Sequence, residues 1–250
     1  MNKLKEKKIF QFLKEAYNNS YEYIKCLKFD KKHGLHLNII SLYGSIIELT
    51  SNCIILYDNG HFTSIPIIVR SILEAYVDLI NLIKYPTYGY SMDLEYYYQW
   101  ISLIEEALKK ENPYLNLMAK SYLTNKALEK FKAEKKKLEC KGYRKLHVSE
   151  RFEKAEMTKE YKSVYNLLCC PTHNNIRSLI DRHCEVEKDD FIVVLHKNRT
   201  MQDEVANIDI LSGILIDSTY RIHKFLNSNI CAKTEDLKNK LTELRKELFY

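Results

Sequence analysis

Two stretches of the sequence hold residues that could bind or transform a phosphate. The first is SIPIIVRSILEAYVDLI, residues 64–80, in which Arg70 and Glu74 stand among apolar residues. Residues four apart share one face of a helix, and a buried charge is costly unless it is paired. The spacing therefore predicts either an ion pair that fixes helix packing, or an arginine that a glutamate orients toward an anion.

The second stretch is YKSVYNLLCCPTHNNIRSLIDRH, residues 161–183. We expect Pro171 to end the helix before it and Thr172 to cap the next helix. His173 would then lie in the first turn of that next helix, with Arg177 one turn later on the same face. His183 follows Arg177 after five intervening residues.

Histidine and arginine together suit the cleavage of RNA. Histidine exchanges protons near neutral pH, and a guanidinium group pairs with phosphate oxygens. A histidine can take the proton of a ribose 2′-hydroxyl, which attacks the adjacent phosphorus while arginine stabilises the added negative charge. The sequence contains no Gly-rich phosphate loop, nucleophile elbow or metal-binding motif. We predict catalysis without cofactor or metal, by Arg70, Glu74, His173, Arg177 and His183.

The segments IIVRSILEAYVDL and YKSVYNLLCCPTHNNIRSLI resemble a bacterial and archaeal family of helical proteins of unknown function. Its members carry Arg-x-x-x-Glu on an apolar helix, then a tyrosine-rich helix that ends in a Leu-Ser step, and a histidine just beyond. The resemblance covers roughly residues 36–186 and implies that Arg70 and Glu74 meet His173 across a bundle. Cys169 stands where the family usually has serine. The matching residues are Arg70, Glu74, Tyr161, Tyr165, Leu168 and His173.

The helical layout is also similar to the HEPN group, helical bundles that often act as metal-independent ribonucleases in toxin and phage-defence systems. The motif of that group is an arginine followed, after four to six residues, by a histidine, and Arg177 and His183 fit this spacing. Six steps along a regular helix leave two side chains about 120° apart. A helix end or a dimer interface must therefore bring the two together. This resemblance implies an endoribonuclease that works as a homodimer.

The sequence predicts an all-α protein. Six Gly and four Pro among 250 residues favour long helices with short connections. The strand-like run DFIVVLHKNR, residues 190–199, is expected to be an extended connection or to pair with a second chain. Hydrophobic periodicity predicts helices at about 3–27, 36–58, 65–85, 92–111, 114–138, 159–169, 173–186, 203–228 and 234–249.

We predict a single helical domain over residues 1–250, HEPN-like, with long N-terminal and C-terminal helices. Its family-like core covers about 36–186, and its C-terminal helices cover 203–250. A leucine stripe on the last helix predicts packing against the body of the domain, with a dimer contact as the alternative. The stripe consists of Leu237, Leu241, Leu244 and Leu248.

Charge and composition limit the partners and the location. The net charge of +6 permits an anionic partner without requiring one. The basic stretch 130–145 is either a solvated helix end or a strip that contacts phosphates. Seven Cys without C-x-x-C spacing indicate reduced thiols. The start of the chain lacks the pattern of a signal peptide, and the apolar runs are too interrupted to span a bilayer. We therefore expect a cytoplasmic protein without a membrane partner.

The function predicted first is a metal-independent endoribonuclease of a toxin or anti-phage defence system, which acts on RNA as a homodimer. Two alternatives stay open. One is a non-catalytic helical module that binds a protein encoded nearby or senses a signal. The other is a pocket for a small anionic ligand around Arg70 and His173. An open cleft with arginine and histidine favours catalysis or ligand binding, whereas a sealed network with every donor satisfied favours the module.

Overall fold

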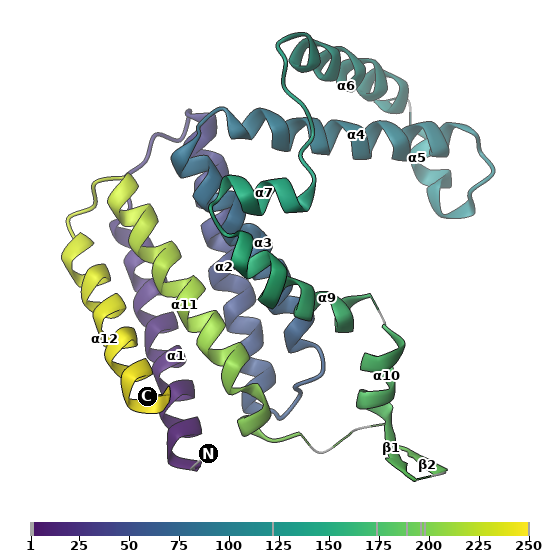
Figure 1. Ribbon diagram of the computed structural model, residues 1–250. Coiled ribbons are helices and arrows are strands. Elements are labelled where there is room, and N and C mark those ends of the chain that lie inside the picture. The colour runs from purple at the N-terminus through teal and green to yellow at the C-terminus, as the bar shows by residue number, and fades with distance from the viewer. Residues whose placement is uncertain are drawn as a thin grey trace. The chain divides into compact units, whose positions relative to one another are not determined.

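The chain is almost entirely helical, which confirms the prediction of an all-α protein (Figure 1). A computed structural model describes residues 3–121, 123–173, 175–188, 190–195, 197 and 199–249, without the side chains of residues 3, 4, 187 and 249. Two compact units are present: residues 1–83 together with 152–250, and residues 84–151.

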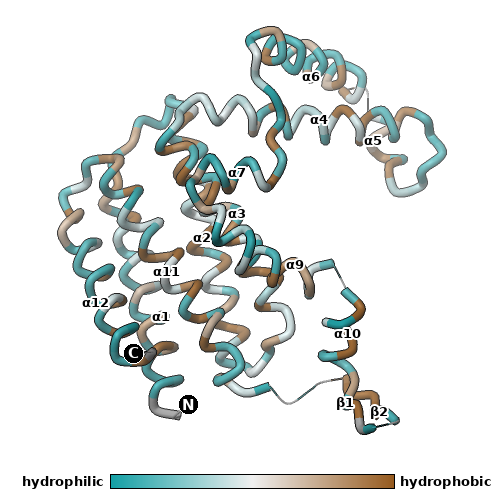
Figure 2. The backbone as a smooth tube through the Cα atoms, viewed as in Figure 1, coloured by the Kyte–Doolittle hydropathy of each residue, from teal (hydrophilic) through white to brown (hydrophobic). Residues whose placement is uncertain are grey.

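Long helices form the body of the first unit. Helix α11 packs against α1, α2 and α12, and α1 also packs against α2 and α12. Apolar residues are dense on α2 and α3, whereas α12 is mostly polar (Figure 2), so α2 and α3 supply much of the core. The helices are α1 (Lys3–Tyr23), α2 (Gly34–Asp58), α3 (Ile65–Lys84), α11 (Met201–Phe225) and α12 (Cys231–Phe249), and a 3-10 turn η1 (Ile24–Cys26) follows α1.

The predicted leucine stripe of the last helix is buried by the first unit itself. The four leucines are only 5–7% exposed, and α12 packs against α11 and α1. The prediction of packing against the chain's own body is therefore confirmed. The stripe is not free to form a dimer contact.

Helix α2 differs from the expectation about apolar runs. By length and composition it could cross a membrane, but core helices of soluble proteins pass the same test. Seven of its residues are buried within the structure: Ile39, Tyr43, Ile46, Ile47, Thr50, Cys53 and Tyr57.

Shorter elements complete the first unit between α3 and α11. They are α8 (Thr158–Glu160), the π-helical segment η3 (Tyr161–Tyr165), α9 (Asn166–Thr172), α10 (Ile176–His183) and the strands β1 (Cys184–Glu187) and β2 (Asp190–Val193).

The two strands correct two predictions. Strands β1 and β2 form an antiparallel pair in which Cys184 faces Val193. The predicted helix at 173–186 therefore ends at His183, because the alternating Cys-Glu-Val-Glu segment pairs with its neighbour instead of continuing the helix. The run from residue 190 is a paired strand rather than an open connection, although residues 196 and 198 of that run lie outside the described residues.

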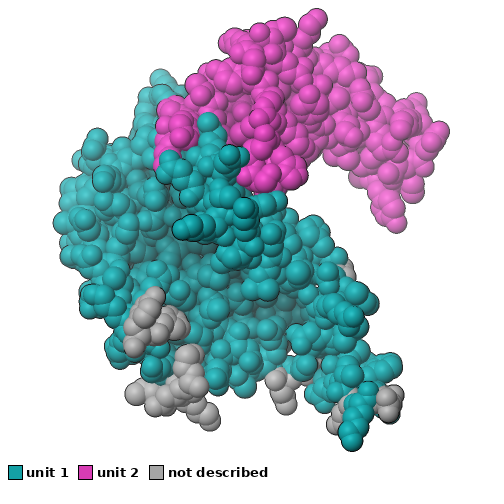
Figure 3. All heavy atoms as spheres, viewed as in Figure 1, with its two compact units in different colours: residues 1–83, 152–250 teal, residues 84–151 magenta. Residues whose placement is uncertain are grey.

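The second unit, residues 84–151, is shown in magenta in Figure 3. Helix α4 packs against α6 through an aromatic cluster that includes Tyr96, Trp100 and Phe131. The predicted helix at 114–138 is divided into separate elements, and residue 122 within it lies outside the described residues. The elements are α4 (Tyr88–Leu108), η2 (Pro113–Leu115), α5 (Asn116–Lys120), α6 (Leu123–Cys140) and the start of α7 (Val148–Lys154), which the sequence did not predict.

The basic stretch at 130–145 lies in this second unit and is largely paired with carboxylates. Lys132 lies 2.8 Å from Glu105, and Lys145 lies 2.8 Å from Glu95. These pairs are exposed, so each contributes little to stability. Their presence favours the interpretation of this stretch as a solvated surface.

Candidate functional site

Helix α3 places Arg70 and Glu74 one turn apart, as predicted. The Nε atom of Arg70 donates a hydrogen bond to Oε1 of Glu74 at 3.0 Å. The two side chains are 17% and 29% exposed, so the ion pair is neither sealed in the core nor freely solvated.

Two further side chains reach Arg70 from η3 and the end of α9. Nη2 of Arg70 donates to the Tyr165 hydroxyl at 2.9 Å, and Nη1 lies 2.8 Å from Nε2 of His173. The Tyr165 hydroxyl in turn donates to Oε1 of Glu74 at 3.0 Å. One guanidinium group thus contacts three acceptors, one on its own helix α3, one on η3 and one just after α9. We call these four residues the Arg70 cluster.

The contact with Arg70 determines the hydrogen positions on His173. A guanidinium group only donates hydrogen bonds, so Nε2 of His173 must accept. The tautomer that accepts at Nε2 carries its hydrogen on Nδ1. His173 is exposed, which leaves this side chain accessible to a ligand.

Aromatic side chains hold Tyr165 in place. Its ring stacks on Tyr161 with 5.4 Å between the ring centroids, and Phe152 lies 4.9 Å from it. Cζ of Arg70 lies 5.1 Å from the centre of the Tyr165 ring, a cation–π arrangement. The π-helical turn at Tyr161–Tyr165 carries both tyrosines, and such turns often occur at functional sites.

Two side chains of the cluster, Tyr165 and Arg70, have raised pKa values. Burial raises the pKa of Tyr165, the hydrogen bond from Arg70 opposes this, and the negative charge of Glu74 adds to it, so the pKa is about 12. Burial lowers the pKa of Arg70, but its bond to Tyr165 and the charge of Glu74 outweigh this and hold the pKa above its ordinary value. Near neutral pH the cluster therefore contains a fixed cation and a neutral tyrosine.

The local structure before His173 differs from the prediction. Pro171 lies inside α9, where it removes one hydrogen bond near the helix end without terminating the helix. Thr172 donates to the carbonyl of Leu168 at 2.8 Å and does not cap the next helix. Asn175 caps α10, and His173 is instead the C-cap residue that follows α9. The predicted shared face of His173 and Arg177 is therefore wrong.

Among the described residues, no hydrogen bond connects Arg177 or His183 to the Arg70 cluster. Arg177 is exposed on α10, and its backbone nitrogen donates to the Asn175 side chain at 3.0 Å. His183 is half-buried at the end of α10, with Nδ1 3.4 Å from the carbonyl of Val194. Among the described residues, no hydrogen bond joins Arg177 to His183. The structure therefore brings together three of the five predicted residues and adds Tyr165, which the prediction of catalytic residues had omitted.

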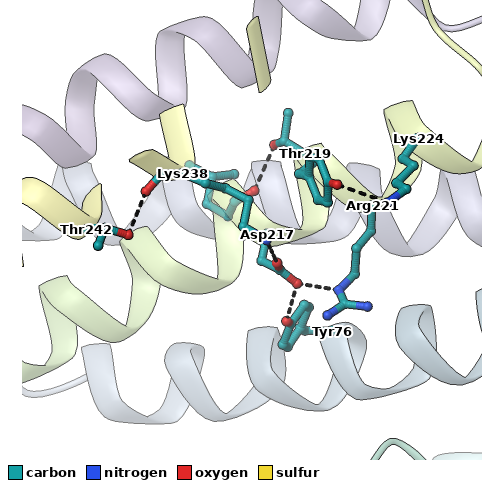
Figure 4. Close-up of polar contacts among 9 residues, drawn as sticks. Tyr76, Asp217, Thr219, Arg221, Lys224, Lys238 and Thr242 are labelled. Atoms are coloured by element: carbon teal, nitrogen blue, oxygen red, sulfur yellow. Dashed lines mark hydrogen bonds and ion pairs between the residues drawn. The ribbon is translucent and has the colours of Figure 1, made fainter. Parts of the chain in front are cut away.

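A second polar cluster, which the sequence analysis missed, surrounds Asp217 of α11 (Figure 4). Tyr76 of α3 donates to Oδ2 of Asp217 at 2.6 Å, and Lys238 of α12 donates to Oδ1 at 2.8 Å. Arg221 also pairs with Oδ2. We call these four residues the Asp217 cluster. Its only signal in the sequence is the spacing of Asp217 and Arg221, four residues apart, the same signal that marked Arg70 and Glu74.

Burial raises the pKa of Asp217, but the donors from Lys238, Tyr76 and Arg221 outweigh this effect, so its pKa lies below the ordinary value. The carboxylate is therefore ionised at neutral pH and joins three helices of the first unit. This arrangement stabilises helix packing, because the charged groups of the cluster pair with each other.

The fold and the Arg70 cluster define an all-α protein in which an Arg-x-x-x-Glu helix bonds to a downstream tyrosine and histidine. The chain belongs to a family of unknown function, DUF5677, whose family model matches residues 36–192. The predicted resemblance to a helical family of unknown function is thereby confirmed. The matched residues include the whole Arg70 cluster, whereas Asp217, Arg221 and Lys238 lie beyond them. No curated protein and no solved structure matches the chain.

Proposed function

We propose that the Arg70 cluster binds a phosphate of single-stranded RNA and cleaves the chain without a metal ion. The observation that carries this proposal is the direct contact between Arg70 and the exposed His173, 2.8 Å apart. A guanidinium group has five N–H donors, and three of them are used by Glu74, His173 and Tyr165. The remaining donors, on a side chain that is 17% exposed, suit a phosphate oxygen.

The chemistry needs one base and one fixed cation. A phosphate that takes up the donors of Arg70 would free Nε2 of His173 to accept the proton of the ribose 2′-hydroxyl. The 2′-oxygen forms a bond to phosphorus, the bond from phosphorus to the 5′-oxygen breaks, and that oxygen takes a proton from water. His173 then releases its proton to solvent. The products carry a 2′,3′-cyclic phosphate and a 5′-hydroxyl. Arg70 stabilises the negative charge that develops on the phosphate oxygens during the reaction.

The surroundings of Arg70 give the remaining side chains distinct roles. Glu74 and Tyr165 orient the guanidinium, because each accepts a hydrogen bond from one of its nitrogens. The stacked ring of Tyr161 restrains Tyr165 in turn. A preoriented cation loses less entropy when it binds a phosphate, which is how positioning residues contribute to catalysis.

The test is cleavage of single-stranded RNA by the purified protein in EDTA. We expect a 2′,3′-cyclic phosphate product and no cleavage of DNA, which lacks the attacking hydroxyl. His173→Ala should abolish cleavage, whereas His61→Ala, which changes an exposed histidine elsewhere, should not. Cleavage that survives His173→Ala, or that requires a divalent metal, contradicts the mechanism. Loss with His183→Ala alone would instead assign the reaction to the Arg177–His183 motif of the HEPN resemblance.

An activating signal could be missing from the purified protein, so the same variants should be expressed in cells. If the protein is a toxin or defence effector, wild type should arrest growth and His173→Ala should relieve the arrest. The proposal also includes a homodimer, as the HEPN resemblance implies. Sedimentation at micromolar concentration measures this directly, and a clean monomer would contradict the dimeric part.

The second candidate is a non-catalytic helical module that binds a partner encoded nearby. It is favoured by the internal bonds of Arg70, which already satisfy one donor on each nitrogen. In that case His173→Ala would lower the free energy of unfolding, and wild type would cleave no RNA in the purified state or in cells.

A further inference from the structure

A cavity of about 590 Å³ lies in the first unit, on the side of α9 that Leu168 and Pro171 form. Its other walls come from the start of α3, from α10 and from the segment that leads into α11. Cavities of this size commonly hold small molecules. None of the four residues of the Arg70 cluster lines it.

Among the residues that the structure describes, three cationic side chains line this cavity: Arg182 from α10, and Lys197 and Arg199 from the segment before α11. The two acidic residues of the lining are already engaged. Nζ of Lys197 donates to the backbone carbonyl of Asp181 at 2.9 Å and lies 3.9 Å from its carboxylate, and Asp203 accepts the backbone N–H of Thr200 at 2.8 Å in the cap of α11.

Arg182 is the cation best suited to a ligand. It is half-buried, and among the described residues it has neither a hydrogen bond nor an ion pair. A guanidinium group that is partly removed from water without a partner is unfavourable, and an anionic ligand would correct this.

A buried carboxylate positions two more donors at the cavity. Glu204 of α11 has 0% exposure. Its Oε1 lies 3.2 Å from Nη2 of Arg199, and its Oε2 accepts from Asn207 at 2.9 Å. Both partners line the cavity. Burying a carboxylate is costly, and here the carboxylate fixes an arginine and an amide that face the same space.

The α9 part of the lining is largely apolar. Leu167, Leu168 and Pro171 of α9 line the cavity there, together with Pro66 at the start of α3. A ligand that fits both the cationic and the apolar parts of this lining has an anionic group and an organic body. Guanidinium groups match the oxygen geometry of phosphate, and two of the three cations of the lining are arginines.

We propose that this cavity binds a phosphorylated small molecule of about mononucleotide size. The phosphate lies against Arg182, Lys197 and Arg199, and the organic body lies against α9. The site is separate from the Arg70 cluster, and the proposal does not depend on RNA cleavage.

Titration calorimetry with ADP, ribose 5-phosphate, inorganic pyrophosphate and adenosine tests the proposal. We expect the phosphorylated compounds to bind and adenosine to bind much more weakly. Arg182→Gln and Arg199→Gln should each weaken ADP binding about tenfold or more, because each removes a charged hydrogen bond. Lys240→Gln, which changes an exposed lysine of α12, should bind ADP as wild type does.

Glu204→Gln should weaken ADP binding as well, because it keeps the shape of the side chain and removes the charge that holds Arg199. His173→Ala should leave ADP binding unchanged, which separates this site from the proposed nuclease. The proposal is overturned if none of the phosphorylated compounds binds at millimolar concentration. It is also overturned if adenosine binds as tightly as ADP, or if the variant with both Arg182→Gln and Arg199→Gln keeps full affinity.

Discussion

The Arg70 cluster and the Asp217 cluster are built from the same kinds of side chain with the charges exchanged. Each contains an arginine and a carboxylate four residues apart on one helix, and each contains a tyrosine hydroxyl. In the first, the guanidinium is central and its neighbours accept. In the second, the carboxylate is central and its neighbours donate. Helix α3 contributes to both, with Arg70 and Glu74 in one and Tyr76 in the other.

The difference in the central group decides what each cluster can do. Asp217 receives bonds from two cations and a tyrosine, so both of its carboxylate oxygens have donors and it joins three helices of the first unit. Arg70 keeps donors beyond its three internal bonds, and its neighbour His173 is exposed. A site with spare donors at its edge suits ligand binding, whereas a completed one suits stability.

The largest expected effect is on stability at Asp217. Asp217→Ala leaves Arg221 and Lys238 without their counter-ion and should lower the free energy of unfolding by about 2–4 kcal/mol. We place the value below that of a fully buried pair because the two cations are 34% and 39% exposed. Urea unfolding measures the change, with Asp236→Ala, an exposed aspartate of α12, as the control. Equal unfolding midpoints for these two variants would show that the cluster does not join the helices.

Arg70→Ala should affect RNA cleavage more than stability. We expect a smaller loss of stability, about 1–2 kcal/mol, because Glu74 is 29% exposed and can be hydrated. RNA cleavage should fall by about 10²-fold or more, since the fixed cation is lost. Arg221→Ala, measured beside it, should lower stability and leave cleavage intact. If Arg70→Ala and Arg221→Ala both lower stability and neither changes cleavage, the Arg70 cluster has only a structural role, as the Asp217 cluster does.

The sequence predicted one part of the Arg70 cluster for a local reason. Arg70 and Glu74 are four residues apart on a strongly periodic helix, and helix geometry alone places them together. The contact of Arg70 with His173 was predicted from the family resemblance. Spacing along one helix cannot predict a contact between residues that are far apart in the sequence. Tyr165 lay within that resemblance, but its hydroxyl could be assigned to Arg70 only after the two segments were seen packed together.

The errors share a physical cause, which is the dependence of short segments on tertiary contacts. The π-helical turn at Tyr161–Tyr165 and the proline kept inside α9 each differ from a regular helix by one or two hydrogen bonds, and the strand pair after His183 forms only because a second strand lies beside it. Local propensity does not resolve such differences. Lys238 reaches Asp217 from another helix, so its partner could not be assigned from spacing either. Long helices with a continuous apolar face were predicted well.

The pH dependence of stability should report on the Asp217 cluster. The pKa of Asp217 lies below its unfolded value, so its contribution is complete above about pH 4 and is lost as the pH falls through the folded pKa. The difference in unfolding free energy between wild type and Asp217→Asn should therefore shrink as the pH is lowered from about 6 to about 2. Parallel curves for the two proteins would mean that the Asp217 carboxylate has no preferential bonds in the folded state.

The smallest expected effects come from removing one hydroxyl in each cluster. Tyr165→Phe keeps the ring stacked on Tyr161 but removes the bonds with Arg70 and Glu74, whereas Tyr76→Phe removes a single bond to Asp217. Each change should lower the free energy of unfolding by about 1 kcal/mol, with Tyr165→Phe the larger because two charged partners lose a bond. Only Tyr165→Phe should slow RNA cleavage, since Arg70 would lose a group that orients it. Equal stability losses with unchanged cleavage would mean that orientation of Arg70 by Tyr165 does not matter, and the two clusters would then differ only in their central charge.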